Sequence, residues 1–343
     1  MVDLDRLYLA PRLIAPAIVA VGALVVLEVG AYLGWHESPA ARNAFGYSRD
    51  TAFSVDKSFV QISSAASRRF WTQRYPLVAL NGTKRVMLIG DSASRGPSFA
   101  RSVSEALREQ LDARCGIHAE VWNLSSPGYG SRRKEVVVDK ALEFRPDLVI
   151  YDANVSTEYE DSREWERYLE YHSWHPKRWV DQLPFLGRVK LSKIERWYWE
   201  WLPEDVRAAS LSEPLDVKIA AIASKTDTAY WTPLMLSNLD RTVDMVRQSG
   251  APMLIFVRSH FDFASGAVVD GGLDREIEER YAPRTGIVVE SSRALLSSHG
   301  DLKRLFADTS HWTDAGKDVI AGGLVEPVSR LLGSPRRCTR QGG

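Results

Sequence analysis

The stretch that most constrains the fold of this chain is a short apolar run that leads directly into a glycine-bounded turn. Val86–Ile89 is followed by the triplet Gly90–Ser92, and the pair Gly96–Pro97 interrupts the chain soon afterwards. An apolar run that ends at a glycine is typical of a central strand in a parallel sheet, where both faces are covered. Residues 98–113 then carry apolar side chains at helical spacing. This strand, turn and helix predict that Ser92 lies at the carboxyl edge of a sheet, where open α/β folds place their reactive groups.

The same alternation of strand and helix continues along the chain. Further strands are predicted over 118–124, 148–151, 253–257 and 287–289, and further helices over 131–144, 236–248, 272–281 and about 314–332. Strands separated by helices imply a parallel sheet with right-handed crossover connections. The expected fold class is therefore α/β, with a flavodoxin-like three-layer α/β/α arrangement around a central five-stranded parallel sheet.

A second short pattern lies near the C-terminus, where Asp308 and His311 stand three residues apart, just ahead of a predicted helix. Together with the Gly90–Ser92 triplet, it resembles the first and last signature blocks of the SGNH (GDSL-type) hydrolase family. The resemblance covers roughly residues 84–154 and 236–332. It implies the same flavodoxin-like fold and the chemistry of a serine hydrolase.

Ser92, His311 and Asp308 have the residue types of a nucleophile, a general base and an orienting carboxylate. A serine hydroxyl is a weak nucleophile until a base removes its proton, and that base needs a third group to fix its tautomer. Asp308 and His311 are spaced so that the carboxylate can reach the far nitrogen of the imidazole. His260, just past the fourth predicted strand, is the competing candidate for the base.

The resemblance also implies an oxyanion hole formed by the backbone N–H groups of Ser92 and Gly128 and by the side chain of Asn154. Glycine at position 128 allows a close approach of the backbone to a substrate. The third block of the family usually reads Gly-x-Asn-Asp, whereas residues 151–156 read Tyr-Asp-Ala-Asn-Val-Ser. Ser156 or a water molecule is therefore an alternative to Asn154.

An almost wholly apolar segment near the N-terminus, Leu13–Trp35, contains Glu28 as its only charge. Its length suits a helix that spans about 30 Å of hydrocarbon. We expect an uncleaved signal anchor, and a cleaved signal peptide or a buried helix are the alternatives. Arginines on both sides of the segment leave its orientation open. A single N-terminal anchor commonly exports the domain attached to it, so the catalytic part is expected outside the cytoplasm, in the periplasm or the extracellular space.

The rest of the chain divides around the alternating core. A helix is expected within Ser54–Tyr75 of the connector. Seven of the eleven tryptophans fall in an aromatic-rich, helical insertion. This insertion is expected to pack on the main domain, to form a lid over the active site, to stack on carbohydrate, or to lie at a membrane interface. The expected organisation is an anchor over 1–36, a juxtamembrane connector over 37–82, a catalytic domain over 83–333 with the insertion at 155–235, and a polar tail over 334–343.

Composition excludes several other classes of function. The formal net charge is zero, so no overall field points to nucleic acid or to an anionic membrane surface. Cys115 and Cys338 are spaced neither for a metal cluster nor for a redox pair, and both one disulfide and two free thiols remain open. His172 and His175 have no further ligand cluster nearby, so no metal site is expected. No complete phosphate-binding glycine motif occurs, and no cofactor is expected.

Taken with the family resemblance, the sequence predicts a membrane-anchored serine esterase that acts on an acyl ester through an acyl-serine intermediate. The resemblance implies an O-acylated envelope glycan as the substrate, and a lipid ester is the alternative. Two other functions remain open. An O-acetyltransferase of a cell-surface polysaccharide would use the same catalytic residues. A non-catalytic SGNH-like domain would bind a glycan or a partner.

Overall fold

The computed structural model describes residues 16, 18–30, 53–62, 70–161, 228–269, 272–297, 299–334 and 338–339. The chain divides into two compact units, one formed by residues 1–44 with 166–215 and the other by residues 45–165 with 216–343. In the first unit, residues 18–30 are helical. In the part of the chain that the structure describes, no helix is long and apolar enough to cross a membrane. The rest of the predicted anchor, most of the predicted insertion, and His172 and His175 lie outside the described residues.

The second unit is built on a five-stranded parallel sheet with the strand order β10-β7-β6-β4-β5. Its strands are β4 (Lys84–Ile89), β5 (Ala119–Asn123), β6 (Leu148–Ala153), β7 (Met253–Val257) and β10 (Ile287–Ser291). The chain runs from the interior strand β4 to the edge strand β5, then crosses back to β6 on the other side of β4 and continues through β7 to the opposite edge at β10, which is the flavodoxin-like order. The predicted α/β class and the five-stranded parallel sheet are confirmed.

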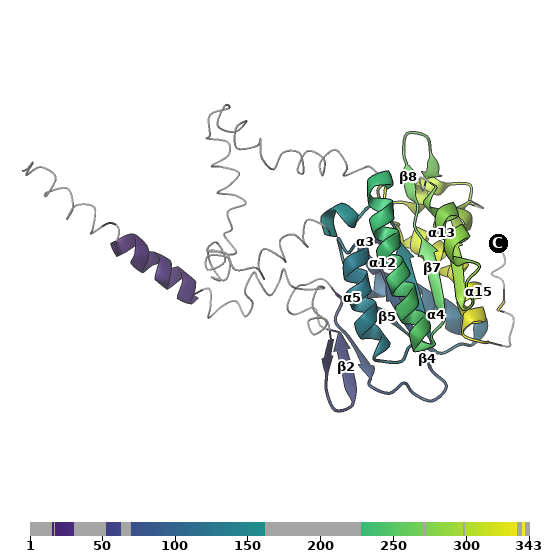
Figure 1. Ribbon diagram of the computed structural model, residues 1–343, viewed down its shortest axis with the longest axis horizontal. Helices are drawn as coiled ribbons and strands as arrows, with labels where there is room; N and C mark the ends of the chain where they lie inside the picture. Colours follow the sequence, from purple (N-terminus) through teal and green to yellow (C-terminus); the bar gives the residue numbers. More distant parts are fainter. Residues whose placement is uncertain are drawn as a thin grey trace, which may run out of the picture. The chain divides into compact units, whose positions relative to one another are not determined.

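Helices cover both faces of this sheet (Figure 1). One face packs on α5, α12 and α13, and the other packs on α4, α14 and α15. Every residue of β4 from Arg85 to Ile89 is buried, as expected for a strand covered on both sides. The helices are α3 (Ser92–Arg95), α4 (Val103–Cys115), α5 (Ser131–Leu142), α12 (Thr228–Ser249), α13 (Leu273–Tyr281), α14 (Ser292–Leu296) and α15 (Asp314–Leu331), with 3-10 turns at η1 (Phe99–Arg101) and η2 (Leu302–Leu305).

The helix predicted to begin at Ser98 begins instead at Val103. Ser102 caps it by accepting a hydrogen bond from the backbone N–H of Glu105, and Gly116 ends it in the left-handed conformation at φ 63°. The residues between Gly96 and Ser102 form a turn and the short η1 segment. This irregular stretch separates the segment that carries Ser92 from the long helix behind it.

The helix expected within Ser54–Tyr75 is wrong for the described residues. A three-stranded antiparallel sheet lies there, formed by β1 (Phe53–Val55), β2 (Phe59–Ile62) and β3 (Gln73–Pro76). In β2, buried and exposed side chains alternate, and such a period of two is the signature of a half-buried strand. A further pair of short strands, β8 (His260–Asp262) and β9 (Ala267–Val269), follows β7.

Cys115 and Cys338 form a disulfide across 223 residues of sequence. Of the two states left open by the sequence, the structure therefore has the paired one. The bond ties the tail to the end of α4, and the backbone N–H of Thr339 donates to the carbonyl of Arg114 at 3.0 Å beside it. Cys338 and Thr339 are thereby held against the C-terminal end of α4.

Candidate active site

The nucleophile segment begins where β4 ends at the carboxyl edge of the sheet. A Cβ atom on Gly90 would lie 2.7 Å from Cβ of Ser94 and 3.0 Å from Oδ2 of Asp152, so only glycine fits at this position. Asp91 then caps α3, because its carboxylate accepts a hydrogen bond from the backbone N–H of Ala93 at 2.9 Å. Ser92 is the first residue of that helix and is therefore fixed directly above the sheet edge.

The second segment is the loop between η2 and α15. Oδ1 of Asp308 accepts hydrogen bonds from the backbone N–H groups of Ser310 and His311, each at 2.8 Å. The backbone N–H of Ala307 donates to the carbonyl of His311 at 2.7 Å, which closes the loop on itself. A Cβ atom on Gly316 would lie 2.1 Å from the carbonyl oxygen of Leu305, so glycine is needed where α15 packs beside η2. The loop is therefore held in one shape by its own backbone.

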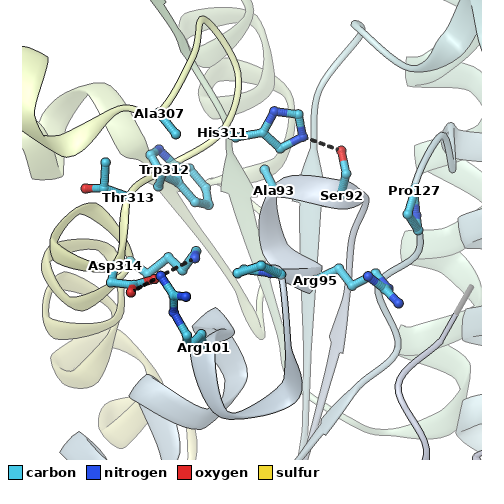
Figure 2. Close-up of a pocket in the computed structure, with 13 residues that line it drawn as sticks. Ser92, Ala93, Arg95, Arg101, Pro127, Ala307, His311, Trp312, Thr313 and Asp314 are labelled. Atoms are coloured by element: carbon cyan, nitrogen blue, oxygen red, sulfur yellow. Dashed lines mark hydrogen bonds and ion pairs between the residues drawn. The ribbon is translucent and has the colours of Figure 1, made fainter.

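These two segments, 219 residues apart in the sequence, meet at one hydrogen bond. Nε2 of His311 lies 2.8 Å from Oγ of Ser92, and Nδ1 of His311 lies 2.8 Å and 2.9 Å from the two carboxylate oxygens of Asp308. Figure 2 shows the imidazole of His311 and the hydroxyl of Ser92 pointing toward one another. The structure thus brings Ser92, His311 and Asp308 together in the order that nucleophilic activation requires.

The electrostatics of Asp308 keep this carboxylate ionised. Burial raises the pKa of Asp308, but the backbone N–H groups of Ser310 and His311 and the His311 ring outweigh burial and hold the pKa below its usual range. The charged carboxylate accepts a hydrogen bond from the N–H at Nδ1 of His311, which leaves Nε2 as the unprotonated nitrogen that faces Ser92. Asp308 therefore both shapes the loop and sets the tautomer of the imidazole.

A buried ionic network lies behind the two segments and joins them. The guanidinium of Arg258, one residue past β7, pairs with the carboxylate of Asp91, and its Nε lies 3.3 Å from Oδ1 of Asp152. Its Nη1 donates to the carbonyl of Ser310 at 3.1 Å. Burial raises the pKa of Asp152, but Arg258 and Lys134 outweigh it and lower that pKa. The buried guanidinium of Arg258 therefore links Asp91, which caps α3, to the backbone of the loop that carries His311.

Replacing Arg258 by Met is expected to lower the free energy of unfolding at neutral pH by about 3–5 kcal/mol, because Asp91 and Asp152 stay buried without their partner. The deficit should shrink as the pH falls. In the variant Asp152 takes up a proton as the pH falls, which relieves the cost of burying its charge. In the wild type the pKa of Asp152 is lowered, so its contribution to the free energy of unfolding is lost only below the ordinary carboxyl pKa of about 4. Urea unfolding at several pH values measures this.

A matched control for that experiment is Arg275→Gln, because Arg275 is an exposed arginine whose ion pair with Glu279 spans 4.0 Å. An exposed pair of this kind contributes about 0–1 kcal/mol. An Arg258→Met protein as stable as the control at pH 7 would show that the buried network does not support the fold.

The three residues predicted for the oxyanion hole are placed differently from one another. Gly128 has φ 70°, a conformation that favours glycine, and its carbonyl accepts a hydrogen bond from Arg133. Asn154 is buried, and its Nδ2 donates to Oδ2 of Asp91 at 3.1 Å and lies 3.4 Å from Oδ1 of Asp152. Its Oδ1 accepts from the hydroxyl of Ser156 at 2.9 Å. The amide of Asn154 thus joins the ionic network, and the oxyanion roles of Ser92, Gly128 and Asn154 stay predictions.

His260, the competing base, is placed at the edge of the same loop. Its Nδ1 lies 3.2 Å from Oγ of Ser310, and burial, followed by the nearby Arg258 charge, lowers its pKa. Ser92 is instead paired with His311. Among the residues that the structure describes, no group of three or more potential ligands is arranged to hold a metal ion.

Sequence reasoning missed Arg258 and the two carboxylates that it pairs with. One signal was present, since Asp91, Asp152 and Arg258 all stand at the carboxyl ends of strands predicted to be parallel neighbours. Side chains at such ends meet at one edge of the sheet. The motif resemblance implies no role for Arg258.

A pocket of about 550 Å³ opens beside the Ser92 hydroxyl. Ser92 and His311 lie in its wall, and apolar lining comes from Ala93, Pro97, Pro127, Ala307 and Trp312. Charged lining comes from Arg95, Arg101, Asp314 and Lys317. A pocket of this size that contains the reactive pair can hold a small ester group.

No protein-family model and no curated protein matches this chain. Solved structures that match include hydrolases of the SGNH and GDSL type. A lipase/acylhydrolase from Enterococcus faecalis is 10% identical, with 76% of this chain and 100% of that chain covered and a TM-score of 0.41. A carbohydrate esterase family 3 protein from Talaromyces cellulolyticus is 9% identical, with 74% and 100% covered and a TM-score of 0.42. AlinE4, an SGNH-hydrolase family esterase, is 13% identical, with 74% and 98% covered and a TM-score of 0.35.

Proposed function

We propose that this protein is a serine esterase in which Ser92 attacks an ester carbonyl and forms an acyl-serine. The observation that carries this proposal is the contact of 2.8 Å between Nε2 of His311 and Oγ of Ser92, with Nδ1 of the same ring held by Asp308. His311 takes the hydroxyl proton as the serine attacks and then gives it to the leaving alcohol. Water, activated by the same imidazole, releases the acid and restores the serine.

The oxyanion formed during attack needs donors aimed at it, and each typically contributes about 3–4 kcal/mol to the rate. We propose the backbone N–H groups of Ser92 and Gly128 for this role. The side chain of Asn154 remains the third candidate, and it would have to give up the longer of the two hydrogen bonds that its Nδ2 donates, the one to Asp152 at 3.4 Å, while keeping the one to Asp91.

For the acyl acceptor we favour water. The side chains of His311 and Asp308 are 42% and 57% exposed, so solvent reaches the imidazole that would activate it. A sugar hydroxyl entering the same position would make the protein an O-acetyltransferase. As the motif resemblance implies, the substrate that we propose is an O-acylated glycan of the cell envelope.

We also propose that the apolar segment 13–35 anchors the chain in a membrane, with the catalytic unit outside the cytoplasm. The disulfide between Cys115 and Cys338 supports this location, because disulfides persist in oxidising compartments and are rare in reducing ones.

Turnover of an O-acetylated polysaccharide by the full-length chain tests the function. We expect release of acetate that depends on Ser92, and mass spectrometry with an added oligosaccharide acceptor separates hydrolysis from transfer. Binding of the polysaccharide without any chemical change to it, in the wild type, would instead identify a non-catalytic binding domain.

A further inference from the structure

The turn that carries Gly128 is tied to the nucleophile segment and closed on itself by backbone hydrogen bonds. The N–H of Ser126 donates to the carbonyl of Gly90 at 3.1 Å, and the N–H of Tyr129 donates to the carbonyl of Ser126 at 3.2 Å. Pro127 at the second position and a φ of 70° at Gly128 are typical of a type II β-turn. Pro127 lines the pocket of the reactive pair (Figure 2), so the N–H of Gly128, which is bonded to the carbonyl carbon of Pro127, lies at the edge of that pocket.

A buried arginine on α5 holds the following peptide of this turn. Nη2 of Arg133 donates to the carbonyl of Gly128, and the guanidinium lies 4.4 Å from the centre of the Tyr129 ring. The peptide between Gly128 and Tyr129 is therefore held at its carbonyl by the guanidinium and at its N–H by the turn itself. Among the described residues, none accepts a hydrogen bond from the N–H of Gly128, so this donor remains for a substrate.

The charge of Arg133 is paired where no solvent reaches it. The Arg133 side chain is fully buried, and its Nε donates to Oδ1 of Asp161, whose side chain is 2% exposed. Oδ2 of the same carboxylate lies 3.4 Å from the backbone nitrogen of Arg133. A Cβ atom on Gly130 would lie 2.6 Å from Cβ of Asp161, so glycine is needed for the carboxylate to come this close. A guanidinium held in this way directs its planar set of N–H groups in one fixed orientation.

Segment 154–161, which carries this carboxylate, is fastened to the same region at two further points. The hydroxyl of Thr157 donates to the carbonyl of Tyr129 at 3.0 Å. Beside it, the carboxylate of Glu158 accepts hydrogen bonds from the backbone N–H and the hydroxyl of Ser131 at 2.7 Å and 2.8 Å. The turn therefore rests on a buried polar framework, and the guanidinium is the part of that framework that reaches the proposed oxyanion donor.

We propose that Arg133, held by Asp161, is a positioning residue that aims the backbone N–H of Gly128 at the oxyanion of the reaction. The proposal rests on the esterase function stated above and on the part that Gly128 plays in it. An oxyanion donor is effective when it lies about 2.7–3.1 Å from the position that the charged oxygen takes. A displacement of about 1 Å can lower a rate by about 10²-fold. Without Arg133, the turn keeps the N–H of Gly128 but loses the contact that fixes its direction.

The test compares hydrolysis of a neutral aryl acetate with that of the matching O-aryl thionoacetate, in which sulfur replaces the carbonyl oxygen. Sulfur accepts hydrogen bonds weakly, so a misplaced donor should slow the ester far more than the thionoester. We expect Arg133→Lys to lower kcat for the ester by about 10²-fold with KM within about twofold, because lysine keeps the charge beside Asp161 but lacks the fork that reaches the turn. The ratio of ester to thionoester turnover should fall by about tenfold or more.

A second variant removes the contact without leaving a buried charge unpaired. Arg133→Met combined with Asp161→Leu replaces both partners by apolar side chains, an exchange that buried ion pairs often tolerate without loss of stability. This double variant should show the same fall in the ratio. Because the ratio is measured within one protein sample, partial unfolding of a variant lowers both turnover rates together and does not mimic the effect.

Arg85 supplies the matched control, because it is another buried arginine and lies near the opposite end of β4 from the nucleophile. Its Nε donates to Glu120 at 2.7 Å, its Nη1 donates to the carbonyl of Phe144 at 2.8 Å, and its guanidinium lies 4.8 Å from the centre of the Trp122 ring. Arg85→Lys should destabilise the fold as Arg133→Lys does, yet keep the wild-type ratio of ester to thionoester turnover.

The outcomes separate this inference from the function on which it rests. A wild-type ratio in the Arg133→Lys and double variants, or an equal fall in the Arg85→Lys control, overturns the positioning role and leaves the esterase function standing. Absence of Ser92-dependent turnover of every ester by the wild type overturns both.

Discussion

The Ser92→Ala variant is expected to lose about 10⁵–10⁶-fold in kcat for ester hydrolysis, because it lacks the oxygen atom that His311 activates in this geometry. The folded structure should remain, since the hydroxyl of Ser92 is bonded to His311 at the edge of the pocket and supports no buried group among the described residues. Hydrolysis of a neutral aryl acetate, followed by absorbance, measures the loss. Residual activity should come from binding and from the oxyanion donors alone.

Ser94 offers a matched control two residues away. Its hydroxyl is buried and donates to Oδ2 of Asp152 at 2.6 Å, so it takes part in the ionic network and not in the pocket. Ser94→Ala should cost about 1 kcal/mol of stability and keep turnover within roughly tenfold of the wild type. If Ser94→Ala removed turnover and Ser92→Ala kept it, the nucleophile would have been misassigned.

The Asp308→Asn variant is expected to lower kcat by about 10³-fold. An amide at this position presents a donor where Nδ1 of His311 must donate, so the imidazole turns to the wrong tautomer and its Nε2 no longer accepts the proton of Ser92. The carboxylate is 57% exposed, so solvent moderates its electrostatic effect and the loss should be smaller than that for Ser92.

The pH dependence of activity bears on the two roles of Asp308, which are to set the tautomer of His311 and to shape the loop. Its folded-state pKa is lowered, so the carboxylate stays ionised as the pH falls, down to values below the ordinary carboxyl pKa of about 4. Any loss of wild-type activity between pH 7 and pH 5 should therefore not reflect protonation of Asp308. If Asp308→Asn kept wild-type kcat across this range, the carboxylate would serve only to shape the loop through the N–H groups of Ser310 and His311.

The fold was largely predictable from the sequence because its strands contain short apolar runs, with Gly90 directly after the first and Pro146 and Pro252 shortly before two of the others. Val86–Ile89 and Met253–Val257 could be placed by composition alone, since strands covered on both faces contain almost nothing but apolar residues. The small sheet of β1, β2 and β3 was not predictable in the same way. Its strands have three or four residues each and carry polar side chains, and runs this short do not distinguish a strand from a helix by periodicity.

The candidate site likewise contains residues that the sequence predicts and one residue that it does not. Ser92, Asp308 and His311 were found because their order and spacing resemble two known blocks. Arg258 was not found, because an arginine after a strand usually lies in solvent, and only the sheet topology shows that two buried carboxylates surround it. Burial of a charge is decided by residues far away in the sequence, so no local pattern predicts it.

The most direct test of the whole account is reaction of the full-length chain with a fluorophosphonate, which modifies a serine only when a neighbouring base activates it. We predict a single adduct by intact mass, located on the peptide that contains Ser92, and none on the Ser92→Ala variant. An unreactive wild-type protein, or an adduct on any other serine, would contradict the claim that His311 and Asp308 activate Ser92.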